Sequence, residues 1–212
     1  IAVIGTGYVG LTTGVCLANR GHDVLCVDAD SEKVDMLQHG HCPILESGLE
    51  VLMNRSVQLG RLHFDVSPVD LGRYSDLVFV AVGTPEGEGG KPDLSYVRQA
   101  LAQVASAVSP DAVIVIKSTV PPTALAMLEA EMQHAAGPGK PSFAVNPEFL
   151  RQGMAVMDTL HPERIVIGVS DARARSRLLE LYAPFAVPLV VTDPVSAMTV
   201  KYVANCFLAT KI

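Results

Sequence analysis

The first ten residues, IAVIGTGYVG, constrain the fold of this chain more than any other segment. A short apolar run leads directly into the pattern G-x-G-x-x-G at Gly5, Gly7 and Gly10. In a βαβ unit the first glycine permits a tight turn, the second lets the backbone approach a diphosphate, and the third lets the next helix pack closely on the strand. That helix would point free N–H groups and the positive end of its dipole at the diphosphate. We therefore expect a cofactor site formed by Gly5, Thr6, Gly7, Tyr8, Val9 and Gly10.

A second apolar run, residues 23–27, ends at Asp28. A carboxylate at this point accepts hydrogen bonds from a ribose 2′-hydroxyl and repels a 2′-phosphate. The next two residues, Ala29 and Asp30, supply no arginine that would offset the repulsion. The pattern favours NAD over NADP as the cofactor. Methyltransferases that use S-adenosylmethionine also carry a glycine-rich loop followed by an acid, so these residues alone leave them as an alternative.

Apolar runs alternate with helical patterns along the whole chain. We expect strands at the N-terminus and near residues 23–27, 57–64, 77–82, 112–116, 143–145, 164–169 and 188–191. We expect helices near residues 9–20, 31–39, 49–53, 121–134 and 195–212, and two more that begin near Asp93 and Asp171, with Ser31 and Asp93 as N-caps. The alternation predicts an α/β fold with a doubly wound, mostly parallel sheet of Rossmann type.

Charge and cysteine content limit the possible partners. The chain has 212 residues, 16 of them basic and 22 acidic, and a net charge of -6, which argues against nucleic acid and anionic membranes as main partners. The apolar runs, about five to seven residues long, are too short to span a bilayer. The four cysteines show no C-x-x-C spacing, so we expect free thiols, no metal site and a cytoplasmic protein.

Polar residues follow three of the predicted strands, at 83–85, 117–119 and 146–148. Doubly wound sheets bind ligands outside the carboxyl ends of their strands, so these tips predict a functional edge, although turn chemistry alone could explain residues 83–85. Glu148 lies between Pro147 and an apolar pair, where partial burial would suit a base that works near neutral pH. A structural salt bridge from Glu148 to Arg151 is the alternative.

Lys201 and Asn205 are four residues apart on the last predicted helix, so both would project from one face. An ammonium and an amide side by side can stabilise a developing oxyanion. The alternative is that both are ordinary surface residues.

The motifs resemble those of the UDP-glucose/GDP-mannose dehydrogenase family, and they span nearly the whole chain in order. The matching stretches are GTGYVGL (5–11), VDAD (27–30), VGTP (82–85), KPDLSYV (91–97), KSTVP (117–121), NPEFLRQG (146–153), PERIVIG (162–168) and KYVANCFLATKI (201–212). The combination of KSTVP and NPEFL is far more specific than the glycine loop, and it argues against most of the case for a methyltransferase.

The resemblance implies that a nucleotide-sugar C6 alcohol is oxidised to a carboxylate with two NAD molecules. It implies that Asp28 and Lys33 hold the adenosine ribose, while Thr119 orders a catalytic water and Glu148 acts through that water as acid and base. Lys201 and Asn205 would stabilise the oxyanion, and Lys201 would assist the first proton removal. The NAD site would also include Val82, Gly83, Thr84, Pro85, Ser118, Thr119 and Gln152. Substrate would contact Glu148, Phe149, Leu150, Arg151, Lys201 and Asn205.

The resemblance also implies that something is missing. The family's nucleophilic cysteine lies in a glycine-rich motif of a second, UDP-sugar-binding domain, and no such motif occurs in this chain. We expect residues 1–194 to be the NAD-binding domain and 195–212 to begin a linking helix through which the full-length protein forms a homodimer. We therefore expect a truncated portion that is inactive alone. A second departure is Gln152, which stands where the family usually has a glutamate and cannot accept a proton.

The PERIVIG stretch favours UDP-glucose, with UDP-glucuronate as the product, and GDP-mannose or a UDP-N-acetylhexosamine remains an alternative substrate. Another NAD-dependent dehydrogenase, of hydroxyacid or 3-hydroxyacyl-CoA type, would need a catalytic His–Glu pair that we cannot place. A non-catalytic NAD-binding module is the third possibility.

Overall fold

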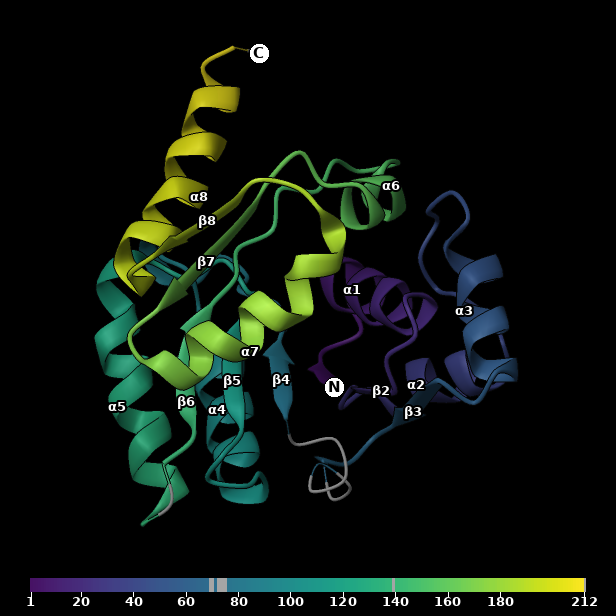
Figure 1. Cartoon of the computed structure of the whole chain (residues 1–212), viewed down its shortest axis with the longest axis horizontal. Helices are drawn as coiled ribbons and strands as arrows, with labels where there is room; N and C mark the ends of the chain where they lie inside the picture. Colours follow the sequence, from purple (N-terminus) through teal and green to yellow (C-terminus); the bar gives the residue numbers. More distant parts are fainter. Residues whose placement is uncertain (69–70, 72–75, 139, 212) are drawn as a thin grey trace.

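Eight strands form one sheet in the order β3-β2-β1-β4-β5-β6-β7-β8 (Figure 1). The computed structural model describes residues 1–68, 71, 76–138 and 140–211. The strands are β1 (Ala2–Ile4), β2 (Val24–Val27), β3 (Leu62–Asp65), β4 (Leu77–Val80), β5 (Val113–Ile116), β6 (Ser142–Val145), β7 (Ile165–Val169) and β8 (Leu189–Thr192). Strands β1 to β6 pair in parallel and only β7 runs antiparallel to its neighbour β6. The predicted doubly wound, mostly parallel α/β sheet is therefore confirmed.

Helices cover both faces of the sheet (Figure 1). One face packs against α1 (Tyr8–Asn19), α2 (Ser31–Gln38), α3 (Leu49–Gln58), α6 (Ala155–Leu160) and α7 (Ala172–Tyr182). The other packs against α4 (Ser95–Ala107), α5 (Leu125–Ala136) and the start of α8 (Pro194–Ala209). Short 3-10 turns are η2 (Glu88–Gly90), η3 (Pro122–Ala124) and η4 (Ala183–Phe185). Burial of both faces explains why the central strands are continuous apolar runs and do not alternate with polar residues.

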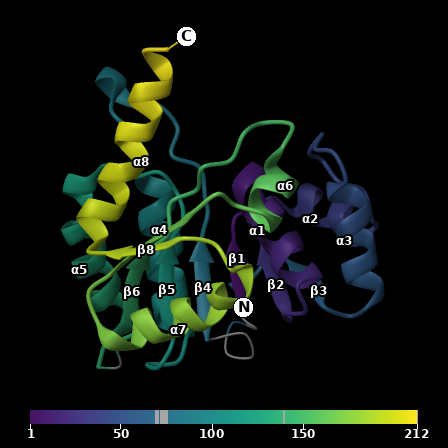
Figure 2. The same cartoon turned by 45° about the horizontal axis from the view of Figure 1, so that its top comes forward.

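The register brings the carboxyl ends of the parallel strands to one edge. Ile4 pairs with Val27 on one side and Val80 on the other, Val80 pairs with Ile116, and Ile116 pairs with Val145. Because β7 is antiparallel to β6, the connection 146–164 leaves and rejoins the sheet at this same edge. Helix α8 continues past the sheet at its C-terminal end in both views (Figures 1 and 2). No helix among the described residues is both long and apolar enough to cross a membrane.

Several local predictions are wrong. Val57 and Gln58 end α3 and do not begin a strand, and β3 starts only at Leu62, because the buried Leu49 and Met53 keep helical spacing up to Gln58. Helix α6 is not evident in the sequence.

The predicted N-caps are also corrected. The carboxylate of Asp30, and not Ser31, caps α2 by accepting hydrogen bonds from the N–H groups of Glu32 and Lys33. The N-cap position of α4 is Leu94, although the Asp93 carboxylate still accepts a 2.8 Å hydrogen bond from the Ser95 N–H. The predicted last helix, 195–212, begins at Pro194 and ends at Ala209, and its predicted final residue, Ile212, lies outside the described residues.

Candidate active site

The glycine-rich turn joins β1 to α1 with three different local requirements. Gly5 has a φ of +95°, which L side chains rarely adopt, and its N–H donates to the Val27 carbonyl at 2.7 Å. A Cβ on Gly10 would overlap the Gly5 carbonyl oxygen, so only glycine lets α1 start this close to the turn. Gly7, by contrast, is exposed, and a Cβ there would meet nothing within 4 Å. The turn therefore leaves room at Gly7 for a ligand, while Gly5 permits the tight turn and Gly10 permits the close approach of α1. The remaining predicted residues of the turn are Thr6, which is buried, and Tyr8 and Val9, which are partly buried.

Asp28 ties the end of β2 to this turn. Its Oδ2 accepts hydrogen bonds from the Thr6 N–H and hydroxyl, both at 2.7 Å, and from Lys33 Nζ at 3.0 Å. Burial alone would raise the pKa of Asp28, but the hydrogen bonds from Thr6, Asp30 and Lys33 outweigh it and hold the pKa below its usual range. The acid is thus ionised and placed beside the glycine turn. The open Gly7 and this carboxylate fit the diphosphate and ribose of NAD, respectively.

The ends of β4 and β5 are bonded to each other. The Ser118 hydroxyl donates to the Val82 carbonyl at 2.6 Å, and the Thr84 hydroxyl donates to the Thr119 carbonyl at 3.1 Å. Gly83 and Pro85 are exposed between these contacts. The four residues 82–85 and the pair 118–119 therefore form one connected rim beside the glycine turn.

A cavity of about 400 Å³ lies next to this rim, under the connection 146–164 and α8. Its lining contains all six residues that the sequence predicts for substrate: Glu148, Phe149, Leu150, Arg151, Lys201 and Asn205. Neither Thr119 nor Gln152 is among its lining residues. The structure thus brings the predicted substrate residues together, while the two others lie outside the cavity wall.

Glu148 and Lys201 form an ion pair in this cavity. Lys201 Nζ donates to Glu148 Oε1 at 2.7 Å, and the side chains are only 7% and 14% exposed, respectively. Glu148 Oε2 accepts a 2.6 Å hydrogen bond from the Leu150 N–H, which fixes the carboxylate. The Lys201 ammonium also lies 5.6 Å from the centre of the Phe149 ring. Two largely buried groups are therefore in direct contact at this position of the cavity. One is a carboxylate that can accept a proton, and the other is an ammonium that can stabilise an oxyanion.

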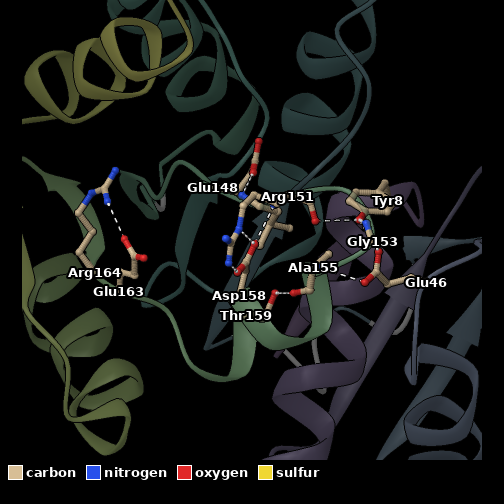
Figure 3. Close-up of polar contacts among 11 residues, drawn as sticks. Tyr8, Glu46, Glu148, Arg151, Gly153, Ala155, Asp158, Thr159, Glu163 and Arg164 are labelled. Atoms are coloured by element: carbon tan, nitrogen blue, oxygen red, sulfur yellow. Dashed lines mark hydrogen bonds and ion pairs between the residues drawn. The ribbon is translucent and has the colours of Figure 1, made fainter. Parts of the chain in front are cut away.

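The sequence left a structural alternative open for Glu148 and for the pair Lys201 and Asn205, and the structure decides these cases differently. Arg151 does not pair with Glu148, because its guanidinium donates to Asp158 at 2.6 and 3.1 Å (Figure 3). Lys201 is buried and is not a surface residue, whereas Asn205 is exposed and lines the cavity. Gln152 is exposed as well.

A largely buried polar cluster lies behind Glu148; two of its members, Lys117 and Asn146, belong to the predicted polar strand ends, and the third is Tyr182. Lys117 Nζ donates to Asn146 Oδ1 at 2.9 Å, the Tyr182 hydroxyl donates to the same oxygen at 2.6 Å, and Asn146 Nδ2 donates to the Val166 carbonyl. The pKa of Lys117 is lowered to about 8, mainly by burial; the nearby Glu148 carboxylate opposes this shift and the Lys201 ammonium adds to it. Lys117 was detectable as a charge directly after an apolar strand. Tyr182, at the end of α7, offered no such signal.

Comparison with known proteins places these features in context. Residues 1–186 match the family described as UDP-glucose/GDP-mannose dehydrogenase family, NAD binding domain. The chain is 46% identical to UDP-glucose 6-dehydrogenase YwqF of Bacillus subtilis, over all of this chain and 48% of the relative. A UDP-glucose dehydrogenase structure from Pyrobaculum islandicum superposes with a TM-score of 0.94 at 40% identity, covering all of this chain and 50% of that one. A GDP-mannose dehydrogenase structure from Pseudomonas aeruginosa gives the same TM-score at 32% identity, covering 99% and 50%. The chain spans about half the length of the curated relatives it matches.

Proposed function

Because this chain belongs to the UDP-glucose/GDP-mannose dehydrogenase family and carries its NAD-binding domain, we propose that it serves the NAD-dependent oxidation of UDP-glucose to UDP-glucuronate. One observation supports this most: the buried Lys201–Glu148 pair lines a cavity at the carboxyl edge of the sheet, and its wall also includes Thr13 and Leu17 of α1, the helix that follows the glycine turn. The relatives named for UDP-glucose are 40–46% identical, against 32% for the GDP-mannose dehydrogenase, which favours UDP-glucose as substrate. The methyltransferase alternative is excluded by the family match.

The cofactor would be held by the residues at the strand ends. The open backbone at Gly7 would receive the diphosphate, and Asp28 with Lys33 would bind the adenosine ribose. The rim of residues 82–85 and 118–119, with Gln152, would line the rest of the site. When bound, NAD supplies the hydride acceptor.

The side chains of this chain would manage the substrate's proton and developing charge. Glu148 would accept the C6 hydroxyl proton through a water that Thr119 orders. Lys201 would assist that proton removal, and Lys201 with Asn205 would stabilise the oxyanion. The 2.7 Å contact between Lys201 and Glu148 supports this division of roles, because it already places donor and acceptor side by side.

We expect this chain alone to bind NAD without oxidising UDP-glucose. None of its four cysteines is flanked by glycine, as the family's nucleophile is, and two of them, Cys16 and Cys26, are buried with pKa values raised by burial to about 12. A thiol held in that way is a poor nucleophile. A cytoplasmic location and dimerisation through α8 remain predictions, and the exposed apolar residues Val203, Phe207 and Leu208 support the second.

Calorimetric titration with NAD and NADP tests the cofactor proposal. We expect clear binding of NAD and at least about tenfold weaker binding of NADP, because Asp28 would face the 2′-phosphate. Equal affinities would refute it. The same titration with UDP-glucose, GDP-mannose and a UDP-N-acetylhexosamine discriminates the substrates. NADH formation from UDP-glucose by the chain alone would contradict the expected inactivity.

A further inference from the structure

The carboxylate of Glu46 joins three segments that lie far apart in the sequence (Figure 3). Glu46 Oε2 accepts hydrogen bonds from the Tyr8 hydroxyl at 2.5 Å and from the Gly153 N–H at 2.9 Å. Glu46 Oε1 accepts the Ala155 N–H at 2.9 Å. The Gly153 N–H also lies 3.1 Å from the Tyr8 hydroxyl oxygen, so the three groups close a triangle. A partly buried carboxylate with three donors is well satisfied, and hydrogen bonds to a charged acceptor are stronger than neutral ones.

One side of this triangle belongs to the cofactor turn. Tyr8 is the first residue of α1 and follows Gly7 directly, at the point proposed to receive the diphosphate. Burial raises the pKa of Tyr8, and the hydrogen bond to Glu46 raises it further. The phenol therefore stays protonated near neutral pH, and its O–H donates a hydrogen bond to Glu46.

The other side belongs to the segment proposed to bind substrate. Gly153 and Ala155 lie two and four residues after Arg151, and the Tyr8 hydroxyl also lies 3.4 Å from the Arg151 carbonyl oxygen. Arg151 is tied in turn to Asp158 by its side chain and by its N–H at 2.9 Å. Residues 151–158 thus form a locally closed unit, which Glu46 and Tyr8 attach to the start of α1.

We propose that Glu46 is a positioning residue that latches the substrate-binding segment onto the cofactor turn, so that occupation of the turn tightens the segment carrying Glu148 and Arg151. The functional part of this proposal rests on the proposed function, since that assigns the segment to substrate. The latch itself does not, because it is a property of the bare chain. A merely structural staple would hold Gly153 and Ala155 equally with and without cofactor.

Amide hydrogen exchange of the 212-residue chain, followed by NMR with and without saturating NAD, tests the latch. Glu46→Gln keeps the shape of the side chain but replaces one acceptor oxygen with a donor group. We expect exchange at Gly153 and Ala155 to accelerate by about tenfold or more in this variant. We expect NAD to slow exchange at both amides in the unaltered chain and to have no such effect in E46Q. Glu180→Gln, an exposed carboxylate on α7, serves as the matched control and should change neither rate.

Tyr8→Phe tests the same contact from the other side, and it keeps the proposal falsifiable should E46Q fail to fold. The double variant Y8F/E46Q should exchange no faster than E46Q alone, because both changes break one connection. Unchanged rates in E46Q, or NAD-dependent protection that persists in E46Q, would overturn the latch. Should NAD fail to bind the unaltered chain, the proposed function falls, while equal rates in E46Q and the unaltered chain without NAD would separately refute the latch.

Discussion

Replacing Asp28 by alanine should damage both stability and cofactor binding, for reasons that can be separated. Asp28 Oδ2 is the acceptor for the Thr6 N–H and the Thr6 hydroxyl, and Thr6 is only 1% exposed. Removing the carboxylate therefore leaves two buried donors without their acceptor. Each unpaired donor costs about 1–3 kcal/mol. Because the hydroxyl can rotate toward another oxygen, we expect a total loss of about 3 kcal/mol in the free energy of unfolding.

The same carboxylate should set the affinity for NAD. Hydrogen bonds from ribose hydroxyls to a charged acceptor are worth about 1.5–3 kcal/mol, so D28A should weaken NAD binding by roughly ten- to a hundredfold. Asp28→Asn, which keeps one acceptor oxygen for Thr6, should lose less stability while still losing affinity. Asp35→Ala on α2, with a side chain 71% exposed, is the matched control and should change unfolding by less than about 0.5 kcal/mol.

Urea unfolding and calorimetry at a temperature where every variant is folded measure the two effects. The pKa of Asp28 is lowered in the folded chain, so its contribution is present at neutral pH and is lost as pH falls below about 3.9 and through the folded pKa. The stability difference between D28A and the unaltered chain should shrink over that acid range. An unchanged NAD affinity in D28A would refute the assignment of Asp28 to the ribose, and unchanged stability would refute the structural reasoning.

Three further tests have defined outcomes. Lys201→Met leaves the Glu148 carboxylate without its cation and should cost about 3 kcal/mol in urea unfolding, whereas the double variant with Glu148→Gln should cost less than the sum of the single changes. The pKa of Lys117 is lowered to about 8, so between pH 8 and about 10.4 the unfolded chain binds more protons and stability from this group rises with pH. Relative to Lys117→Met, the unaltered chain should gain up to about 1.4 kcal/mol per pH unit over that window, and a flat difference would contradict the burial of this ammonium. Gly10→Ala places a Cβ against the Gly5 carbonyl oxygen and should abolish detectable NAD binding in calorimetry, with retained affinity as the contrary result.

Local chemistry made the geometry of the proposed cofactor site predictable. The glycine turn and Asp28 are adjacent through β1 and β2, so their spacing in sequence translates directly into proximity in the sheet. The polar strand ends were predictable for the same reason, because parallel strands end at one edge.

The proposed substrate site depends on contacts that sequence spacing does not encode. Glu148 pairs with Lys201 across 53 residues, and that choice over Arg151 is decided by how α8 packs beside β6 and β7. The misplaced start of the strand predicted at residues 57–64 has a similar origin, since burial of Met53 in the core shared with α1 keeps residues 57 and 58 in α3. The tie from Glu46 to Gly153 and Ala155 spans more than a hundred residues and has no local signal at all.

The reversed direction of β7 and β8 also decides where α8 leaves the sheet. Ile1 precedes β1 at the amino edge of the sheet, whereas α8 extends outward past the carboxyl edge (Figure 2). A linker attached before Ile1 would therefore tether the protein to a sensor chip with the carboxyl edge of its sheet, the side of the proposed site, turned toward the flowing solution. Anchoring through Lys211 would press that side against the chip and slow the arrival of any analyte.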